Sequence, residues 1–182
     1  RRPDRRQFFL EKNPFEVEFF SAVDVLDLDE GYLKRNGYGP DLSFKDPFKG
    51  RYVTWAEVAC FLSHSALWAK CLELNEPLIV LEDDAYLIGD LDERRILSVM
   101  SNCDLLYLQR NENEPTKVVD LGNGVERPHY PYNTTAYCVT PSGAEKLLAT
   151  NILRNIIPVD EYLPRRIQAG SLVGAAFSSD IF

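Results

Sequence analysis

Short apolar runs alternate with amphipathic stretches along the whole chain, and this arrangement is typical of an α/β domain. Strands are predicted at residues 16–23, 78–81, 104–108 and 135–139. The run 78–81 has four consecutive aliphatic residues, which predicts a strand buried on both faces, as in parallel sheets flanked by helices. The pattern therefore predicts an α/β fold with helices packed on a central sheet.

Capping patterns mark the starts of the helices. Thr54 and Glu57 form a capping box ahead of apolar residues at helical spacing, and Asp90 and Glu93 repeat the pattern. Helices are thus predicted at residues 54–72, 90–100, 140–148 and 158–168, the last interrupted by proline. Residues 29–50 are expected to form an irregular loop with a short helical turn at most, and 111–131 an exposed polar stretch. The apolar tail 171–182 either completes the sheet or packs on it.

Three carboxylates follow the aliphatic strand directly: Glu82, Asp83 and Asp84. Ligands of open α/β sheets collect beyond the carboxyl ends of the strands, which is where these residues fall. Two carboxylates about 4 Å apart repel by roughly 4 kcal/mol at an effective dielectric near 20, so the cluster needs a counter-charge. Alternation along an extended backbone sends Glu82 and Asp84 to one side, where they can share one Mg²⁺ or Mn²⁺ ion. The alternative is a solvated acidic turn that caps the next helix.

Composition limits the classes of function. The chain has 182 residues, of which 45% are hydrophobic, and we expect one globular domain over residues 1–182. A net charge of -8 disfavours general affinity for nucleic acid or anionic membranes, and no apolar stretch reaches the roughly 20 residues of a membrane span. The chain begins in mid-pattern with no strand ahead of its first arginines, so we expect it to be truncated at its ends.

The four cysteines show no paired spacing of the zinc or redox type. Cys60 and His64 are four residues apart on a predicted helix, but the neighbouring sequence supplies no third or fourth ligand, so buried free thiols are the favoured interpretation. Asn133 opens a glycosylation acceptor sequence, which matters only in a secretory compartment.

Several segments together resemble one family in this order along nearly the whole chain. They are residues 2–6, 22–24, 44–51, 54–68, 82–84, 104–108, Tyr137 with 143–144 and 146–148, and 158–164. These segments resemble glycosyltransferase family 25, and within it the procollagen galactosyltransferases. The resemblance implies a Rossmann-like nucleotide-sugar transferase fold of the type called GT-A, with a mainly parallel central sheet. It also implies a UDP-sugar donor, an acidic metal motif and inverting transfer to a hydroxyl.

The resemblance assigns roles to the reacting groups. It implies that Glu82 and Asp84 hold Mn²⁺ or Mg²⁺, while Asp83 ligates the ion or contacts the sugar. Inversion in one displacement needs a general base, for which Asp160 and Glu161 are the candidates. The alternative for this pair is a helix cap.

The remaining site assignments concern the donor. Asp24 either accepts a hydrogen bond from ribose or uracil or is a turn residue. Arg2, with Arg5 and Arg6, either binds the donor phosphates or is a solvent-exposed charge on a helix surface. Glu57 matches a glutamate of the family and is assigned to donor binding, and His64 either orders the donor pocket or is a satisfied polar residue beneath the metal loop.

The expected activity is metal-dependent transfer of galactose or glucose from a UDP-sugar to an acceptor hydroxyl. The acceptor implied by the resemblance is hydroxylysine of collagen-like chains. A lipopolysaccharide glycosyltransferase is the alternative enzyme, and an inactive family member serving as a binding or adhesion module is the alternative outside enzymes. Alanines at 56 and 59, where the family usually has glycines, and the absence of histidine after His129 favour the inactive alternative. Endoplasmic reticulum lumen fits a collagen-modifying enzyme and cytoplasm fits a bacterial type, while homo-oligomerisation stays open.

Overall fold

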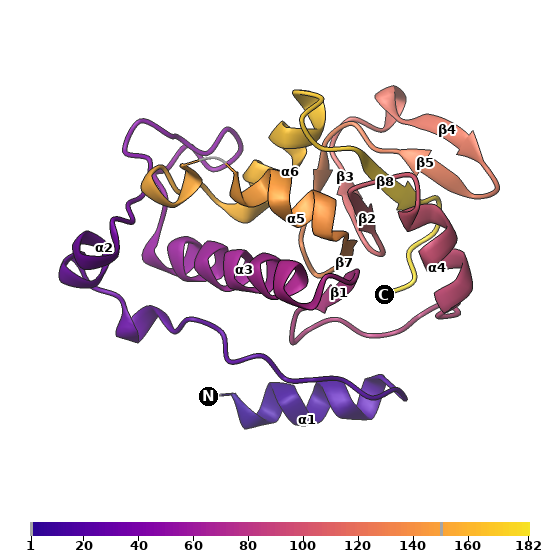
Figure 1. Ribbon diagram of the computed structural model, residues 1–182, viewed down its shortest axis with the longest axis horizontal. Coiled ribbons are helices and arrows are strands. Elements are labelled where there is room, and N and C mark those ends of the chain that lie inside the picture. Colours follow the sequence, from indigo (N-terminus) through magenta and orange to yellow (C-terminus); the bar gives the residue numbers. More distant parts are fainter. Residues whose placement is uncertain (1, 150) are drawn as a thin grey trace.

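The computed structural model describes residues 2–149 and 151–182. Its helices are α1 (Pro3–Lys12), α2 (Glu30–Asn36), α3 (Trp55–Leu74), α4 (Glu93–Met100), α5 (Pro141–Leu148) and α6 (Val159–Gln168), with short 3₁₀ turns at Val25–Asp27, Pro115–Lys117 and Ile152–Arg154. Its strands are β1 (Leu78–Leu81), β2 (Leu105–Tyr107), β3 (Asn111–Glu112), β4 (Val119–Gly122), β5 (Val125–Arg127), β6 (Pro131–Tyr132), β7 (Ala136–Val139) and β8 (Gly174–Phe177). The α/β fold class is confirmed (Figure 1).

Six strands form one sheet in the order β1-β7-β2-β8-β5-β4, and β3 pairs with β6 in a separate ribbon. The prediction of a mainly parallel sheet is wrong, because only β2 and β8 run parallel among the described pairs. Strand β7 returns between β1 and β2 and runs antiparallel to both, while β4 and β5 form a hairpin on one edge. Alternating strands and helices do not by themselves encode strand direction, which depends on the route of the connections.

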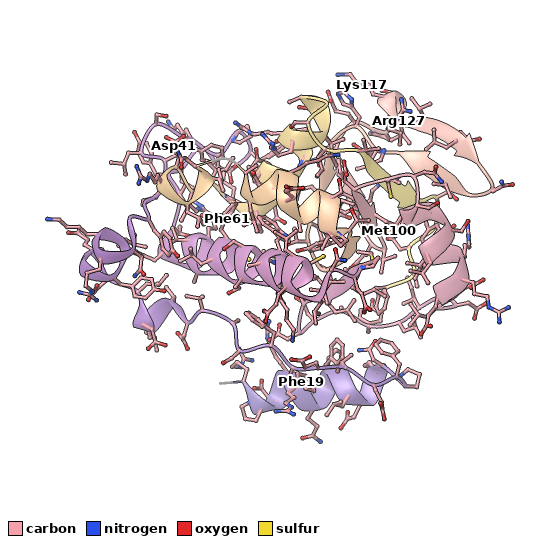
Figure 2. The ribbon with its side chains drawn as sticks, viewed as in Figure 1. Phe19, Asp41, Phe61, Met100, Lys117 and Arg127 are labelled. Atoms are coloured by element: carbon pink, nitrogen blue, oxygen red, sulfur yellow. The ribbon has the colours of Figure 1, made fainter. Side chains whose placement is uncertain are left out.

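The sheet separates two apolar cores. Alternate residues of β2 divide between them, so that Leu105 and Tyr107 face one core while Leu106 and Leu108 face the other. Helices α3, α5 and α6 cover the first face; α4, Phe9 of α1 and the C-terminal residues cover the second. Figure 1 shows α3 and α5 side by side, and in Figure 2 the fully buried Phe61 of α3 lies in that helical layer.

The strand β1 is an edge strand, which corrects the prediction that it is buried on both faces. It pairs with β7 alone among the described strands, and Ile79 is 36% exposed. Its aliphatic run reflects packing on both cores, since Val80 packs in the first core and Leu81 against the second.

Two local predictions also need correction. Residues 16–23 form no strand, because this extended segment hydrogen-bonds to no sheet edge; Phe19 packs instead on Phe9 and beneath the Arg6 guanidinium. Helix α4 is capped by Asp92, which accepts from the Arg95 N–H at 3.1 Å, and not by Asp90.

The polar stretch 111–131 is more ordered than expected, since it contains four short strands and a 3₁₀ turn. Residues 29–50 do contain a helical turn, α2, capped by Asp29 and ended by Gly37 in the left-handed conformation. The tail completes the sheet through β8, which is one of the two outcomes expected for it. No helix in the described parts of the chain combines the length and apolar character that a membrane span requires.

Candidate active site

The acidic triplet forms a turn at the end of β1. The Glu82 N–H donates a hydrogen bond to the Thr135 carbonyl at 2.8 Å, and the Ala85 N–H donates one to the Glu82 carbonyl at 3.1 Å. Because the strand ends at Leu81, the alternation expected for Glu82 and Asp84 does not continue through the triplet. Glu82 is half-buried, whereas Asp83 and Asp84 are exposed.

Glu82 is held between α3 and the loop ahead of β7. Its Oε1 accepts a hydrogen bond from the Thr134 hydroxyl at 2.6 Å and lies 3.5 Å from Nε2 of His64. Burial raises the pKa of Glu82, but the contacts to His64 and Thr134 outweigh it and hold the pKa below its ordinary value. Glu82 is therefore an anion in this site.

The Asp160 carboxylate lies on the other side of the same hydroxyl. Its Oδ1 is 3.2 Å from Thr134 Oγ1. Asp160 lies in the first turn of α6, and the N-cap residue of that helix, Pro158, makes no side-chain capping hydrogen bond. Burial first, and then the charge of Glu82, raise the pKa of Asp160, while Thr134 and Lys49 oppose the shift. Two carboxylates that share one hydroxyl thus have pKa values displaced in opposite directions, an arrangement typical of acid–base sites.

Glu161 has a different environment from its neighbour. It is fully buried, and its Oε2 accepts hydrogen bonds from the Tyr130 hydroxyl at 2.6 Å and from Arg165 at 3.3 Å. Its Oε1 has no hydrogen-bond partner among the described residues. The side chain anchors α6 to the segment before β6 and does not reach the surface.

His64 lies below Glu82 and is only 4% exposed. Its Nδ1 is 2.8 Å from the Tyr137 hydroxyl, and the two rings stack at a centroid distance of 5.7 Å. The folded chain also brings Cys60, His64 and Glu82 together, with one ligand atom from each within 4.8 Å of the others. The neighbouring sequence offers no third ligand for Cys60 and His64, but the fold brings Glu82, from the turn after the next strand, close to both.

Cys60 is a neutral thiol in the absence of a cation. Burial, followed by the charges of Glu82, Asp160 and Glu57, raises the pKa of the Cys60 thiol to about 12. Ligation by Cys60 would require the thiolate, which a bound cation would have to stabilise against this shift. All four cysteines are free thiols, as the sequence predicted.

The exposed part of the acidic turn suits a hard cation. Burial and the charges of Glu82 and Asp83 raise the pKa of Asp84, so the negative charge of the turn is incompletely balanced. Arg5 of α1 supplies a partial counter-charge through a 2.6 Å ion pair with Asp83. Oxygen donors with excess negative charge are the ligands that Mg²⁺ and Mn²⁺ prefer, and the metal role of Glu82 and Asp84 stays a prediction.

The other predicted donor-binding residues have partners within their own segments. Arg2 pairs with Asp4 on the exposed start of α1. Asp24 accepts from the Leu26 N–H and caps a 3₁₀ turn, which supports its alternative interpretation as a turn residue. Glu57 closes the predicted capping box and binds both guanidinium nitrogens of Arg51 at 2.8 Å.

Sequence reasoning missed Thr134 and an aromatic wall beside Asp160. Tyr130 and Tyr132 are two residues apart and share one face, where the exposed ring of Phe48 contacts both at centroid distances of 6.3 and 5.8 Å. The positive φ of Asn133 interrupts the extended backbone between Tyr132 and Thr134, so a period-2 pattern could have found the two tyrosines but not Thr134. The site therefore combines the β1 turn, α3, the start of α6 and the segment 130–134.

Comparisons with known proteins identify the family of the chain. The model of the family "Glycosyltransferase family 25 (LPS biosynthesis protein)" matches residues 1–163. A glycosyltransferase 25 family member of Aedes aegypti is 34% identical over 176 residues, covering 90% of this chain and 29% of that protein. Procollagen galactosyltransferase 2 of Homo sapiens is 31% identical over 178 residues, with 90% and 28% covered. Inactive glycosyltransferase 25 family member 3 of Homo sapiens is 34% identical over 177 residues, with 90% and 30% covered.

The chain thus spans less than a third of the length of these curated relatives. Among solved structures, apo UDP-glucose pyrophosphorylase aligns with 98% of this chain and 70% of that chain, at 16% identity and a TM-score of 0.40, which is too low to support an argument. The family match covers most of the chain and includes the acidic turn and the start of α6. The chain belongs to glycosyltransferase family 25.

Proposed function

We propose that this chain is the catalytic part of a metal-dependent inverting glycosyltransferase with a Rossmann-like GT-A fold. It transfers galactose or glucose from a UDP-sugar to an acceptor hydroxyl, for which hydroxylysine of collagen-like chains is the proposed acceptor. The observation that carries the proposal is the pairing of Glu82 with Asp160 across Thr134 at the end of β1, beside the acidic turn. The family membership and the relative named procollagen galactosyltransferase 2 support the choice of reaction and acceptor.

In this proposal Glu82 and Asp84 hold Mn²⁺ or Mg²⁺, and Asp83 contacts the ion or the donor sugar. A divalent ion held there would supply Lewis-acid stabilisation of the diphosphate leaving group. Arg5, paired with Asp83, brings a guanidinium to the same edge of the site, where it can balance phosphate charge. Arg2, Asp24 and Glu57 gain no support as donor ligands from their geometry, since each is engaged locally.

Asp160 is the proposed general base. Its raised pKa makes it a better proton acceptor than an ordinary aspartate, which supports this role. Phe48, Tyr130 and Tyr132 contact one another, and the Tyr130 hydroxyl binds Glu161 next to Asp160; these rings are the proposed apolar surface for the acceptor. Glu161 is the weaker candidate because it is fully buried.

A second candidate function is a non-catalytic binding module. Several relatives of similar identity carry the word "inactive" in their names, including those of Mus musculus and Homo sapiens. Hydrolysis of the donor separates the two functions, because a binding module releases no sugar.

The test is a panel of nucleotide sugars incubated with the chain and Mn²⁺, with free sugar and UDP as the readout. We expect turnover with UDP-galactose or UDP-glucose, and its loss in Asp84→Asn. Asp120→Asn, an equal change of charge on the β4–β5 hairpin, is the matched control and should retain turnover. Equal turnover with a GDP- or CMP-sugar, or full activity of Asp84→Asn, contradicts the proposal.

A further inference from the structure

A chain of buried polar groups extends from the core of the molecule to Glu82. Trp68 Nε1 donates to the Tyr137 hydroxyl at 3.0 Å, and that hydroxyl lies 2.8 Å from Nδ1 of His64. The Nε2 atom of the same imidazole lies 3.5 Å from Oε1 of Glu82, which also accepts from Thr134. Trp68 and Tyr137 are 0% exposed and His64 is 4% exposed, so water does not substitute for a missing partner.

The chemistry of these groups allows one arrangement of protons that leaves no donor unpaired. Indole Nε1 only donates, so the Tyr137 oxygen accepts from Trp68 and its single proton must find another acceptor. Among the described residues, Nδ1 of His64 is the partner that lies within hydrogen-bond distance of that hydroxyl. If Nδ1 carried a proton instead, the Tyr137 hydroxyl would be buried without an acceptor, which is unfavourable.

We infer that Tyr137 is a positioning residue that fixes the tautomer of His64, with the proton on Nε2 directed at Glu82. The inference rests on the proposed function, in which Glu82 is a metal ligand, and it adds a residue that positions this ligand. In this arrangement Glu82 Oε1 faces two donors, His64 and Thr134, and Oε2 is the oxygen that remains for the cation. His64 then orients a ligand through its N–H and is not itself a ligand, although Cys60, His64 and Glu82 lie close enough together to suggest a three-residue metal site.

The tautomer can be observed directly, because the chain contains only two histidines. Nitrogen-15 NMR of histidine-labelled protein at a pH of about 8, above the usual histidine range, resolves two rings, and His129→Gln assigns them. We expect the His64 ring in the native chain to carry its proton on Nε2 and none on Nδ1. A proton on Nδ1 overturns the inference without any variant having to fold.

Tyr137→Phe tests the cause of this preference. Removal of the hydroxyl takes away the donor to Nδ1, so the His64 signals should move towards the other tautomer. The matched control is Tyr107→Phe. Tyr107 is directly opposite Tyr137 in the β2–β7 register and is equally buried, but its hydroxyl has no hydrogen-bond partner among the described residues. Unchanged His64 signals in Tyr137→Phe, or equal changes in both variants, contradict the inference.

The link to Glu82 is tested by calorimetry of UDP binding in the presence of Mn²⁺. We expect Tyr137→Phe to weaken binding about 10-fold and Tyr107→Phe to leave it unchanged. The His64→Gln variant keeps a side-chain N–H for Glu82, and this N–H does not depend on Tyr137. Adding Tyr137→Phe to His64→Gln should therefore have little further effect on the affinity for UDP. If Tyr137→Phe weakens UDP binding equally in the native chain and in His64→Gln, Tyr137 does not act through His64 and the inference is wrong.

The two proposals fail separately. If the native chain shows no Mn²⁺-dependent UDP binding, the proposed function fails, whereas the NMR result still decides the tautomer of His64. If the native chain binds UDP with Mn²⁺ and the NMR shows the Nδ1 tautomer, the role of Tyr137 fails and the proposed function stands.

Discussion

Glu57 shows how much a single side chain contributes to the edge of the site. Its carboxylate accepts hydrogen bonds from the N–H and hydroxyl of Thr54 at 2.8 Å and from both terminal nitrogens of Arg51. Burial raises its pKa, but Arg51 and Thr54 outweigh burial and lower the pKa to about 2. Glu57 therefore fixes the start of α3, one turn before Cys60 and two turns before His64.

We expect Glu57→Gln to reduce the free energy of unfolding by about 1–2 kcal/mol at neutral pH, the usual range for a lost cap and a partly exposed ion pair. Because the folded pKa is lowered, this stabilisation is complete above the ordinary value of 4.5 and is lost as the pH falls through about 2. Denaturant unfolding of the native chain and the variant at several pH values measures the difference. The exposed Glu73→Gln on the same helix is the control, and a difference that widens on acidification contradicts this account.

Asp160 and Glu161 are adjacent in sequence, but their side chains have different roles in the structure. We expect Asp160→Asn to leave UDP-sugar binding nearly intact while it slows transfer by roughly 10²- to 10⁴-fold, the usual range for general-base catalysis. Glu161→Gln should instead lower stability by about 1–3 kcal/mol, because a buried and hydrogen-bonded carboxylate is altered, with transfer retained in the folded protein. Steady-state kinetics and denaturant unfolding of both variants separate these effects. Loss of transfer in a folded Glu161→Gln alone reverses the assignment.

At the scale of single residues, the sequence predicted those groups whose position follows from the chain itself. The apolar run before Glu82, Asp83 and Asp84 and the helix start at Asp160 correctly predicted where these residues lie in the elements, while their roles stay predictions. Thr134 and Tyr137 were not found as site residues. Their contacts with Glu82 and His64 depend on the register of β7 against β1, which the local sequence does not specify.

Among the elements, α5 is packed unusually closely on β2. The N–H and hydroxyl of Thr140 both donate to the Asp104 carbonyl, and the Asp104 carboxylate binds Lys146 and the Val173 N–H at 2.7 Å. A Cβ atom at Gly143 would lie 2.3 Å from the Asp104 carbonyl oxygen. The glycine is needed here for close approach of two backbones and not for its conformational freedom.

Gly143→Ala should therefore destabilise the protein by about 1–3 kcal/mol, the usual cost of overpacking, because a backbone atom has to move. Gly39→Ala is the matched control, since a Cβ there would meet its nearest atom at 3.6 Å. Thermal or denaturant unfolding of the two variants gives the comparison. If the two variants have the same free energy of unfolding, α5 can move away from β2 without loss of stability and the prediction is wrong.

Most helices were predictable because their caps are local. Thr54 with Glu57 and Thr140 with Pro141 mark helix starts that the structure confirms. The direction of the strands was not predictable, since β7 reaches its place between β1 and β2 only after the long excursion through residues 108–135. The β4–β5 hairpin had a local signal, Gly122-Asn123-Gly124 with positive φ at each residue, but its exposed polar strands concealed it.

Across the whole molecule, the site is assembled from four separate parts of the chain. Glu82 comes from the turn after β1, His64 from α3, Thr134 from the segment before β7 and Asp160 from α6. Helix α3 and strand β1 are consecutive, but the other two parts come from much later in the chain, so the site exists only when both the sheet and the first core are formed. A ligand that binds this site therefore stabilises the complete fold, which is a property of the molecule as a whole.

Thermal unfolding provides the last prediction. With Mn²⁺ present, UDP at about 100 times its dissociation constant adds about 2.7 kcal/mol, which corresponds to a rise in Tm of roughly 5–10 °C for a domain of this size. Removal of the metal with EDTA should abolish the rise, because the exposed carboxylates of the β1 turn then repel the diphosphate. GDP with Mn²⁺ tests whether the nucleotide base is recognised, and Asp84→Asn tests whether the rise in Tm needs the carboxylate that would hold the ion. A rise of the same size in EDTA would show that UDP binds through Arg5 and other cations alone, and the metal role of Glu82 and Asp84 would then have to be abandoned.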